Sequence, residues 1–143
     1  MGRIIIGVDG SDESFDALRF GLEEARLHHD DVTVVTAFKY PALAMVPRPE
    51  DPPTPPQVLR EARGLVERLL EKVTPPPGVN VEAKAVEGGA AVVLLSEARD
   101  AGADLLVVGA RGRGGFRGLA LGSVSNQCAT HATCPVAIVH HGR

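Results

Sequence analysis

Residues 103–127 read ADLLVVGARGRGGFRGLALGSVSNQ, and this stretch decides the fold. It begins with a short, uninterrupted apolar run, Leu105–Val108, which is typical of a strand covered on both faces in a parallel sheet. A glycine-rich loop, residues 109–122, follows this strand. Ser123 then opens a predicted helix, whose first amides have no partner within the helix and attract an anion. The order of strand, glycine-rich loop and helix predicts a cradle for phosphate.

The glycine-rich loop combines small residues with cationic ones. Its glycines let backbone amides approach a ligand without a Cβ atom in the way, and positive φ angles cost little at them. They are Gly109, Gly112, Gly114, Gly115, Gly118 and Gly122. Arg111, Arg113 and Arg117 add guanidinium groups beside those amides. A loop of this composition can also be a plain hinge, so the spacing of its residues has to decide.

The spacing excludes two common phosphate-binding motifs. No Gly-Lys-Ser or Gly-Lys-Thr occurs in the chain, so there is no Walker A loop, and the glycines do not fit Gly-x-Gly-x-x-Gly. They do fit Gly-x-x-Gly, nine residues and Gly-Ser, with Gly109, Gly112, Gly122 and Ser123 in these places. This pattern resembles the ATP-binding signature of the universal stress protein family. The resemblance covers the chain except for residues 39–56.

Length and composition predict one domain over residues 1–143. A chain of 143 residues with 44% hydrophobic residues is long enough to bury a core, and nothing in it suggests a second domain. The formal charge is −3 and aromatic residues make up 3%, so the chain lacks the cationic face and the stacking platform of a nucleic-acid-binding protein. We expect no nucleic-acid partner.

The sequence favours a cytoplasmic protein that does not contact a membrane. The apolar part of the N-terminal stretch MGRIIIGVD is too short for a signal peptide, and no apolar run approaches the length of a membrane span. The cysteines, Cys128 and Cys134, match neither a zinc pair nor a redox Cys-x-x-Cys motif. We therefore expect inert thiols.

Strand and helix patterns alternate along the chain. Short apolar runs, rich in β-branched residues, predict strands at 3–8, 32–38, 79–86, 105–108 and 135–139. Helical spacing of apolar residues predicts helices at 11–27, 57–73, 90–101 and 123–132. Ser11 is the expected N-cap of the first helix.

Residues 39–56 interrupt this alternation. They hold seven of the eleven prolines, which argues against a helix or a central strand. A connection of this length is typical of a lid, a binding loop or a disordered insert. Because it leaves the carboxyl end of the second strand, on the side of Asp9 and Gly109, we predict a lid.

The alternation predicts an α/β fold, a doubly wound five-stranded parallel sheet with helices on both faces. The strand at 79–86 alternates apolar and polar residues, which suits a sheet edge, and the last strand takes the other edge. The order 3-2-1-4-5 follows, and it is also the order in the resembled family, whose fold is Rossmann-like, of the adenine nucleotide alpha hydrolase type. Such sheets bind ligands at the switch point, here between the strands that end at Asp9 and Gly109.

Asp9 has two interpretations. Its carboxylate is well placed to accept hydrogen bonds from ribose hydroxyls or from the adenine amine. It can equally serve only to organise the turn into the first helix. The fold rule and the family resemblance favour the functional interpretation.

The resemblance implies a nucleotide site. In the family, the matching aspartate contacts the adenosine, a residue near the end of the second strand touches the base, and the Gly-Ser pair holds phosphates. By residue match the site comprises Gly7, Val8, Asp9, Ala37, Val108, Gly109, Arg111, Gly112, Gly122, Ser123, Val124 and Ser125. The resemblance also implies that the ligand is ATP, with Mg²⁺ bound through its phosphates.

Binding is favoured over catalysis. The five histidines lie at helix ends, on the last helix or after the last strand, and no water-activating base stands out, so we predict no catalytic residue and no metal ligand. The family resemblance thus implies a cytoplasmic ATP-binding stress-response protein. The alternative is a slow ATPase or nucleotidyl-transfer enzyme of the adenine-nucleotide hydrolase superfamily. The adenylating branch would have Ser-Gly-Gly-x-Asp-Ser where this chain has Val8-Asp9-Gly10-Ser11.

The last strand predicts a homodimer. Residues 136–139 are apolar on both faces, yet the topology places them at a sheet edge, where unpaired main-chain groups invite another chain. Dimerisation across this strand is also what the family resemblance implies. The alternative is a monomer in which residues 140–143 fold over the edge.

Overall fold

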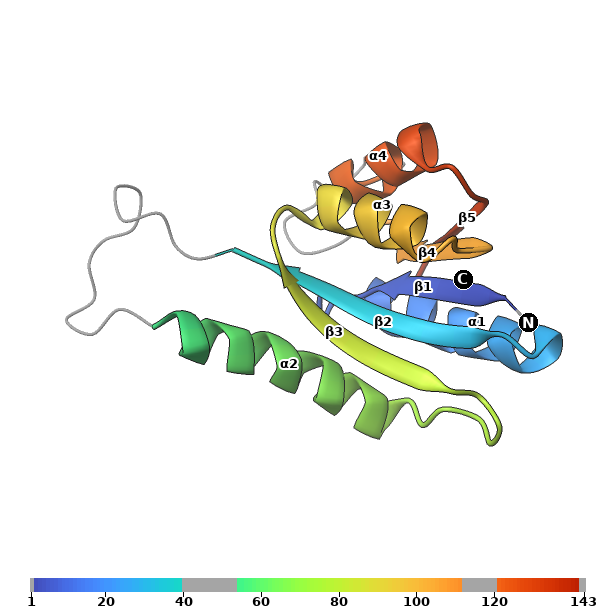
Figure 1. The fold of residues 1–143 in the computed structure, drawn as a ribbon, viewed down its shortest axis with the longest axis horizontal. Helices are drawn as coiled ribbons and strands as arrows, with labels where there is room; N and C mark the ends of the chain where they lie inside the picture. Colours follow the sequence, from blue (N-terminus) through green and yellow to red (C-terminus); the bar gives the residue numbers. More distant parts are fainter. Residues whose placement is uncertain (1, 40–53, 112–120, 142–143) are drawn as a thin grey trace.

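The computed structural model of the chain describes residues 2–39, 54–111 and 121–141. Strands and helices alternate within them (Figure 1). The strands are β1 (Arg3–Gly7), β2 (Asp31–Phe38), β3 (Val81–Glu87), β4 (Leu105–Gly109) and β5 (Val136–Val139). The helices are α1 (Asp12–His28), α2 (Pro55–Lys72), α3 (Ala90–Asp100) and α4 (Ser123–His131). Each predicted strand and helix is present.

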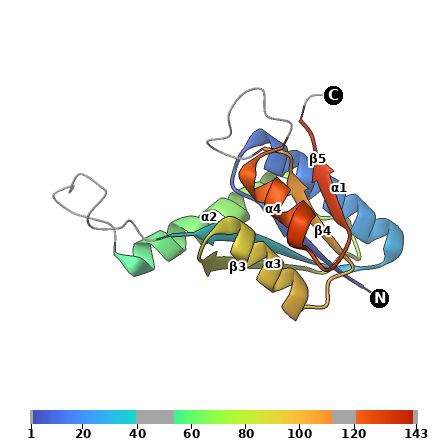
Figure 2. The ribbon, with the colours of Figure 1, turned by 90° about the horizontal axis from the view of Figure 1, so that it is seen from above.

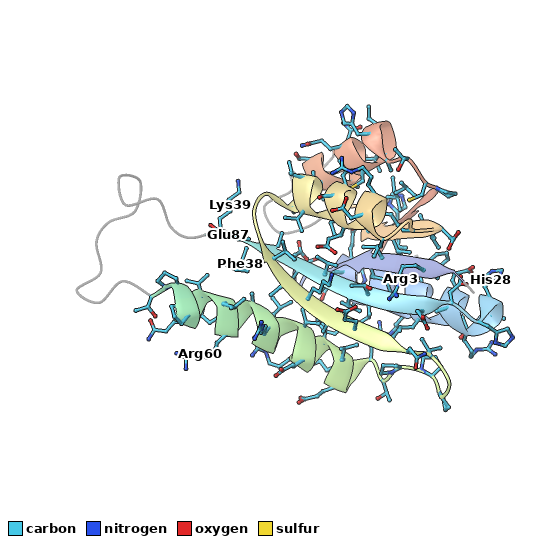
Figure 3. All side chains as sticks on the ribbon, viewed as in Figure 1. Arg3, His28, Phe38, Lys39, Arg60 and Glu87 are labelled. Atoms are coloured by element: carbon cyan, nitrogen blue, oxygen red, sulfur yellow. The ribbon has the colours of Figure 1, made fainter. Side chains whose placement is uncertain are left out.

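The strands form one parallel sheet in the order β3-β2-β1-β4-β5, which confirms the predicted order. Ile5 in the central strand β1 lies opposite Thr33 of β2 and Leu106 of β4. The strands begin at one end of the sheet and finish at the other. In Figure 3, Arg3 marks the start of β1, and Phe38 and Glu87 mark the carboxyl ends of β2 and β3. The connections after β1 and β4 lead to opposite sides, so a crevice forms at the carboxyl ends of these two strands.

Helices cover both faces of the sheet, and each face has its own core. α1 and α2 pack on the face that carries Ile4 and Ile6, and α3 and α4 pack on the face that carries Ile5. α2 lies below the sheet in Figure 1, and α3 and α4 lie in front of it in Figure 2. The three isoleucines are at most 1% exposed, as expected for a strand covered on both faces. β1 is therefore a rigid support for the residues that follow it.

The start of α1 agrees with the prediction. Ser11 is the N-cap, and its Oγ accepts a hydrogen bond from the Ser14 amide at 3.3 Å. Gly10 turns the chain out of β1 with a φ of 86°, a conformation that favours glycine. Asp12 and Glu13 occupy the first turn, where negative charge suits the helix dipole.

The start of α2 differs from the prediction. Thr54 is the N-cap and forms a capping box with Gln57, so Pro55 and Pro56 belong to the helix rather than to the proline-rich segment. Proline fits there because the first helical amides have no partner within the helix. The predicted lid falls mainly on residues 40–53, which lie outside the described residues.

The start of β3 also differs. The amide of Val79 donates to the Pro76 carbonyl at 3.2 Å, so Val79 belongs to the turn after α2, and the strand begins at Val81. β3 does lie at the sheet edge, as predicted, and the ammonium of Lys84 pairs with Glu97 of α3 at 3.3 Å.

Within the described residues, no helix is long and apolar enough to cross a membrane. The longest helix, α2, has 18 residues, but charged side chains such as those of Arg60 and Glu67 are exposed along it. Its buried residues are Val66 and Leu69, which face the sheet.

Candidate functional site

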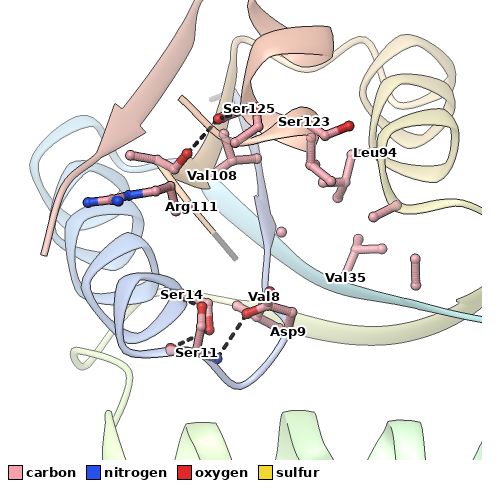
Figure 4. Close-up of a pocket in the computed structure, with 17 residues that line it drawn as sticks. Val8, Asp9, Ser11, Ser14, Val35, Leu94, Val108, Arg111, Ser123 and Ser125 are labelled. Carbon is pink, nitrogen blue, oxygen red and sulfur yellow. Dashed lines mark hydrogen bonds between the residues drawn. The ribbon is translucent and has the colours of Figure 1, made fainter. Parts of the chain in front are cut away.

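The carboxyl ends of β1, β2 and β4 surround a cavity of about 360 Å³ at the switch point (Figure 4). The first turns of α1, α3 and α4 complete its wall. Each predicted site residue that the structure describes lines this cavity: Gly7, Val8, Asp9, Ala37, Val108, Gly109, Arg111, Gly122, Ser123, Val124 and Ser125. Gly112 lies outside the described residues. That the residues around the cavity bind a nucleotide stays a prediction.

Six further lining residues were missed by the sequence analysis. They are Ser11, Ser14, Val35, Ala90, Leu94 and Ala110. Periodicity could have found three of them. Val35 lies two residues before Ala37 on the same strand face, and Leu94 lies one helical turn after Ala90 at the start of α3. Ser14 lies one turn after Ser11 in the same way.

One end of the cavity is apolar. Val35 and Ala37 of β2 and Leu94 of α3 line it, and Val8 of the segment after β1 also borders the cavity. The Leu94 side chain explains why β1 ends in glycine, because a Cβ atom on Gly7 would lie 2.6 Å from Leu94 Cδ1. A flat, largely apolar ring is the kind of group that such a surface accepts.

Asp9 takes part in the turn and also lines the cavity. Its Oδ1 accepts a hydrogen bond from the Ser11 amide at 2.9 Å, which is the turn-forming contact that the local interpretation predicts. Ser14 supports the same turn, since its hydroxyl donates to the Ser11 carbonyl at 2.8 Å and accepts from the Gly10 amide at 3.1 Å. The two interpretations of Asp9 are therefore compatible, because the turn fixes the carboxylate at the wall of the cavity.

The two ends of the glycine-rich loop are joined at Ala110. Its carbonyl accepts hydrogen bonds from the Gly122 amide at 2.6 Å and from the Ser125 hydroxyl at 2.7 Å. Its amide donates to the Val139 carbonyl of β5 at 2.8 Å. Ser125 is 1% exposed, so its hydroxyl closes the loop rather than facing the cavity space. These bonds fix the start of α4 beside the end of β4.

The described glycines of the loop are needed because other atoms lie close to their Cα atoms, not because they adopt a positive φ. Within the described residues, positive φ occurs at glycines outside this loop, and Gly122 has a φ of −75°. A Cβ atom on Gly109 would lie 2.9 Å from Glu13 Cβ, and one on Gly122 would lie 3.2 Å from the Ala110 carbonyl oxygen. Both glycines are therefore required by the backbone that passes beside them.

The start of α4 offers donors to an anion. The N-cap is Gly122, which has no side chain to accept from the first amides of the helix, and the first helical bond runs from the Asn126 amide to the Gly122 carbonyl. Ser123, at the first helical position, lines the cavity and is exposed. An anion in the cavity at this end would meet amides that have no partner within the helix and the positive end of the helix dipole.

Two groups of titratable residues lie away from the cavity. None of the five histidines, all described, lines it; His141 instead contacts Asp16 of α1 at 2.5 Å, which raises the pKa of His141. Burial raises the pKa of the Cys128 thiol to about 11, and that of Cys134 is raised for the same reason. Both thiols are thus protonated near neutral pH and poorly reactive.

In the described part of the chain, no cluster of His, Cys, Asp or Glu could hold a metal ion.

A doubly wound parallel sheet with a cavity at its switch point defines a Rossmann-type α/β protein. A sequence model of the universal stress protein family matches residues 1–140. The chain belongs to the universal stress protein family, which confirms the resemblance seen in the glycine-rich loop.

Relatives and solved structures agree with this family. Universal stress protein YxiE of Bacillus subtilis is 32% identical, over 96% of this chain and 97% of its own length. A universal stress protein of Mycobacterium tuberculosis is also 32% identical over 96% of this chain, but the match covers 47% of that protein, so this chain spans about half its length.

Two solved structures have the same fold. UspA of Lactobacillus plantarum has a TM-score of 0.79 at 20% identity, over 96% of this chain and 97% of its own. A universal stress protein solved in complex with cAMP has a TM-score of 0.77 at 25% identity, over 99% of this chain and 98% of its own.

Proposed function

We propose that this chain binds an adenine nucleotide, with ATP as the physiological ligand, in the cavity at the carboxyl ends of β1 and β4. The bound nucleotide stabilises one conformation that protein partners recognise during a stress response in the cytoplasm. One observation carries the proposal: the cavity has an apolar wall of Val35, Ala37 and Leu94 at one end and, at the other, the first amides of α4, which have no partner within the helix. A base and a phosphate group fit these two ends.

Main-chain groups of β2 supply a reason for adenine. The Val8 amide donates to the Val35 carbonyl at 2.9 Å, so the main chain of Val35 faces β1. Alternate residues of a strand face the same side, so the amide and carbonyl of Ala37 face that side too. β1 pairs with β2 only as far as Gly7, opposite Val35. Beyond Gly7, the Ala37 amide can donate to N1 of adenine, and the Ala37 carbonyl can accept from the N6 amine. Guanine has a donor at N1 and an acceptor at O6, so it does not match these two groups.

A similar universal stress protein was solved in complex with cAMP, a ligand that has the same adenosine group as ATP. This similarity supports the proposal that the site binds adenosine. The number of phosphates on the ligand is to be measured. Magnesium, if the ligand is ATP, would be held by the phosphates, since no metal-ligand cluster occurs in the described residues. Asp9 and Arg111 are the ionisable residues among those found to line the cavity, and turnover is not part of the proposal.

The test of the proposed function asks which nucleotide the protein holds. We expect mass spectrometry of the gently denatured, purified protein to release an adenine nucleotide. Calorimetry should give ATP a dissociation constant at least about tenfold below that of GTP, because guanine would leave the main-chain groups of Ala37 unpaired. Equal affinities for ATP and GTP, or no binding of either, would contradict the proposal.

Arg111 provides a second test, directed at the phosphate end. Its guanidinium extends over α1 in Figure 4, on the side of the cavity away from Val35. A phosphate at the start of α4 would draw it in, so Arg111→Ala should weaken ATP by about tenfold and adenosine by less than about twofold. Calorimetry with both ligands measures the difference. Equal losses for ATP and adenosine would place Arg111 away from the phosphates.

A further inference from the structure

Glu13 joins the first turn of α1 to the glycine-rich loop. Its carboxylate Oε2 accepts a hydrogen bond from the Arg111 amide, a contact between residues 98 positions apart in the sequence. The backbone of Glu13 also packs on the end of β4, where a Cβ atom on Gly109 would lie 3.1 Å from the Glu13 carbonyl carbon. Glu13 is half-buried in this contact.

The helix dipole alone does not account for this placement. An acidic residue in the first turn of α1 is favourable for the dipole whichever way its side chain points. The neighbouring Asp12 shows this, since its side chain is 81% exposed and lies 4.0 Å from His141. The Glu13 carboxylate instead points toward the main chain of Arg111, the second residue after β4. Among the described residues, no Lys, Arg or His lies within ion-pair distance of Glu13, and the described cation that interacts with its charge at longer range is His141.

The contact lies at the proposed phosphate end of the cavity. Arg111 lines the cavity, and its Cα would be 3.3 Å from a Cβ atom on Gly122, the N-cap of α4. The Glu13 carboxylate therefore accepts from the amide of a residue in the cavity wall, and it places a negative charge next to that wall, although Glu13 itself is not among the lining residues. Phosphate groups placed at the first amides of α4 would be repelled by this charge.

We propose that Glu13 determines how much phosphate charge the site accepts. The inference rests on the proposed function, because it concerns the same cavity. Glu13 disfavours ATP that carries its full negative charge and admits ATP whose charge is reduced by Mg²⁺, while adenosine is unaffected. Glu13 is thus a specificity-determining residue that selects the magnesium complex of the nucleotide.

The charge of Glu13 can be removed without removing its hydrogen bond. In Glu13→Gln the side chain keeps its length and an oxygen that accepts from the Arg111 amide. Asp12→Asn is the matched control, because it removes one negative charge from the same helical turn at an exposed position. Both variants change the net charge equally, so a difference between them reports the position of the charge.

The experiment is calorimetry of parent, Glu13→Gln and Asp12→Asn with adenosine, AMP, ATP in EDTA and ATP with Mg²⁺. For Glu13→Gln we expect ATP in EDTA to bind about three- to tenfold more tightly, as one partly shielded charge predicts. The gain should be smaller for AMP and for ATP with Mg²⁺ and absent for adenosine. Asp12→Asn should change every affinity by less than about twofold. Melting curves without ligand check that both variants fold as the parent does.

The possible outcomes separate this inference from the proposed function. An unchanged ATP affinity in EDTA, or equal changes for ATP and adenosine, would overturn the role of Glu13 while adenine binding by the parent still stands. A gain in Asp12→Asn as large as in Glu13→Gln would show a general effect of net charge and would also overturn it. If the parent binds none of the four ligands, the proposed function itself is wrong.

Discussion

Gly122→Val is expected to weaken ATP binding by about a hundredfold or more while the protein stays folded. The position has a φ of −75° and a ψ of 170°, which any residue adopts, so the cost is steric rather than conformational. The added Cβ atom would lie 3.2 Å from the Ala110 carbonyl oxygen and 3.3 Å from Arg111 Cα. Both neighbours are backbone atoms that cannot rotate aside, so the backbone of Gly122 and the first amides of α4 have to shift by a few tenths of an ångström relative to Ala110.

Steric strain of this kind costs about 1–3 kcal/mol in a packed region, and the valine methyl groups additionally occupy space where a phosphate would approach. We expect a moderate decrease in melting temperature of about 2–8 °C and an unchanged far-UV circular dichroism spectrum. Calorimetry with ATP measures the main effect. A variant that binds ATP as tightly as the parent would show that the start of α4 does not hold the phosphates.

Gly64→Val is the matched control for this substitution. Gly64 lies in α2, far from the cavity, and a Cβ atom there would meet Arg68 Nη1 at 3.1 Å. The end of an arginine side chain moves aside easily, so the control should retain its affinity for ATP. Its helix propensity should rise slightly, because valine forms helices better than glycine, so no loss of stability is expected from the backbone. A loss of ATP binding in both variants would point to a general effect of added volume.

The sequence predicted the sheet well because each strand carries its own signal. Ile4, Ile5 and Ile6 form an uninterrupted apolar run, and such a run fits only a strand that is covered on both faces. The alternation of polar and apolar residues in β3 predicted an edge, and this edge is observed. With the two edges known, the order of the strands and the position of the switch point followed.

The prediction of the site was incomplete where it depends on contacts between distant elements. Periodicity places Val35 on the strand face of Ala37 and Leu94 on the helix face of Ala90, but only the packing of α3 beside β2 shows that these core positions border a cavity. Glu13 looks like an ordinary first-turn acid, and its contact with Arg111 depends on the placement of α1 against β4. The boundary of α2 was missed because prolines were interpreted as breaking a helix, although Pro55 and Pro56 begin one.

We propose that the chain forms a homodimer through β5. Substitutions at the open edge of this strand should therefore have the largest effect on assembly. β5 pairs with β4 along one side only. The carbonyls of Pro135 and Val139 accept bonds from the β4 side, at 3.0 and 2.8 Å. Because alternate residues of a strand face the same side, the amides and carbonyls of Val136 and Ile138 face the open edge. An antiparallel copy of β5 across a two-fold axis would satisfy these groups.

Side-chain burial decides how this dimer should be tested. Val136 and Ile138 are partly buried against the core that contains Cys128, so lysine at these positions would disturb the monomer as well as the interface. Ile138→Pro is more specific for the edge, since it removes an amide that faces outward and leaves the bonds between β4 and β5 in place. Ala83→Pro is the matched control, because Ala83 is exposed on the opposite edge strand and by the same alternation also faces outward.

Light scattering at micromolar concentration should give a dimer for the parent and for Ala83→Pro, and a monomer for Ile138→Pro. Melting curves at two protein concentrations provide a second measurement, since the melting temperature of a dimer rises with concentration and that of a monomer does not. A monomeric parent would contradict the proposal directly. A dimer that persists in Ile138→Pro would place the interface away from the edge of β5, because the loss of an outward-facing amide matters only where a second strand accepts it.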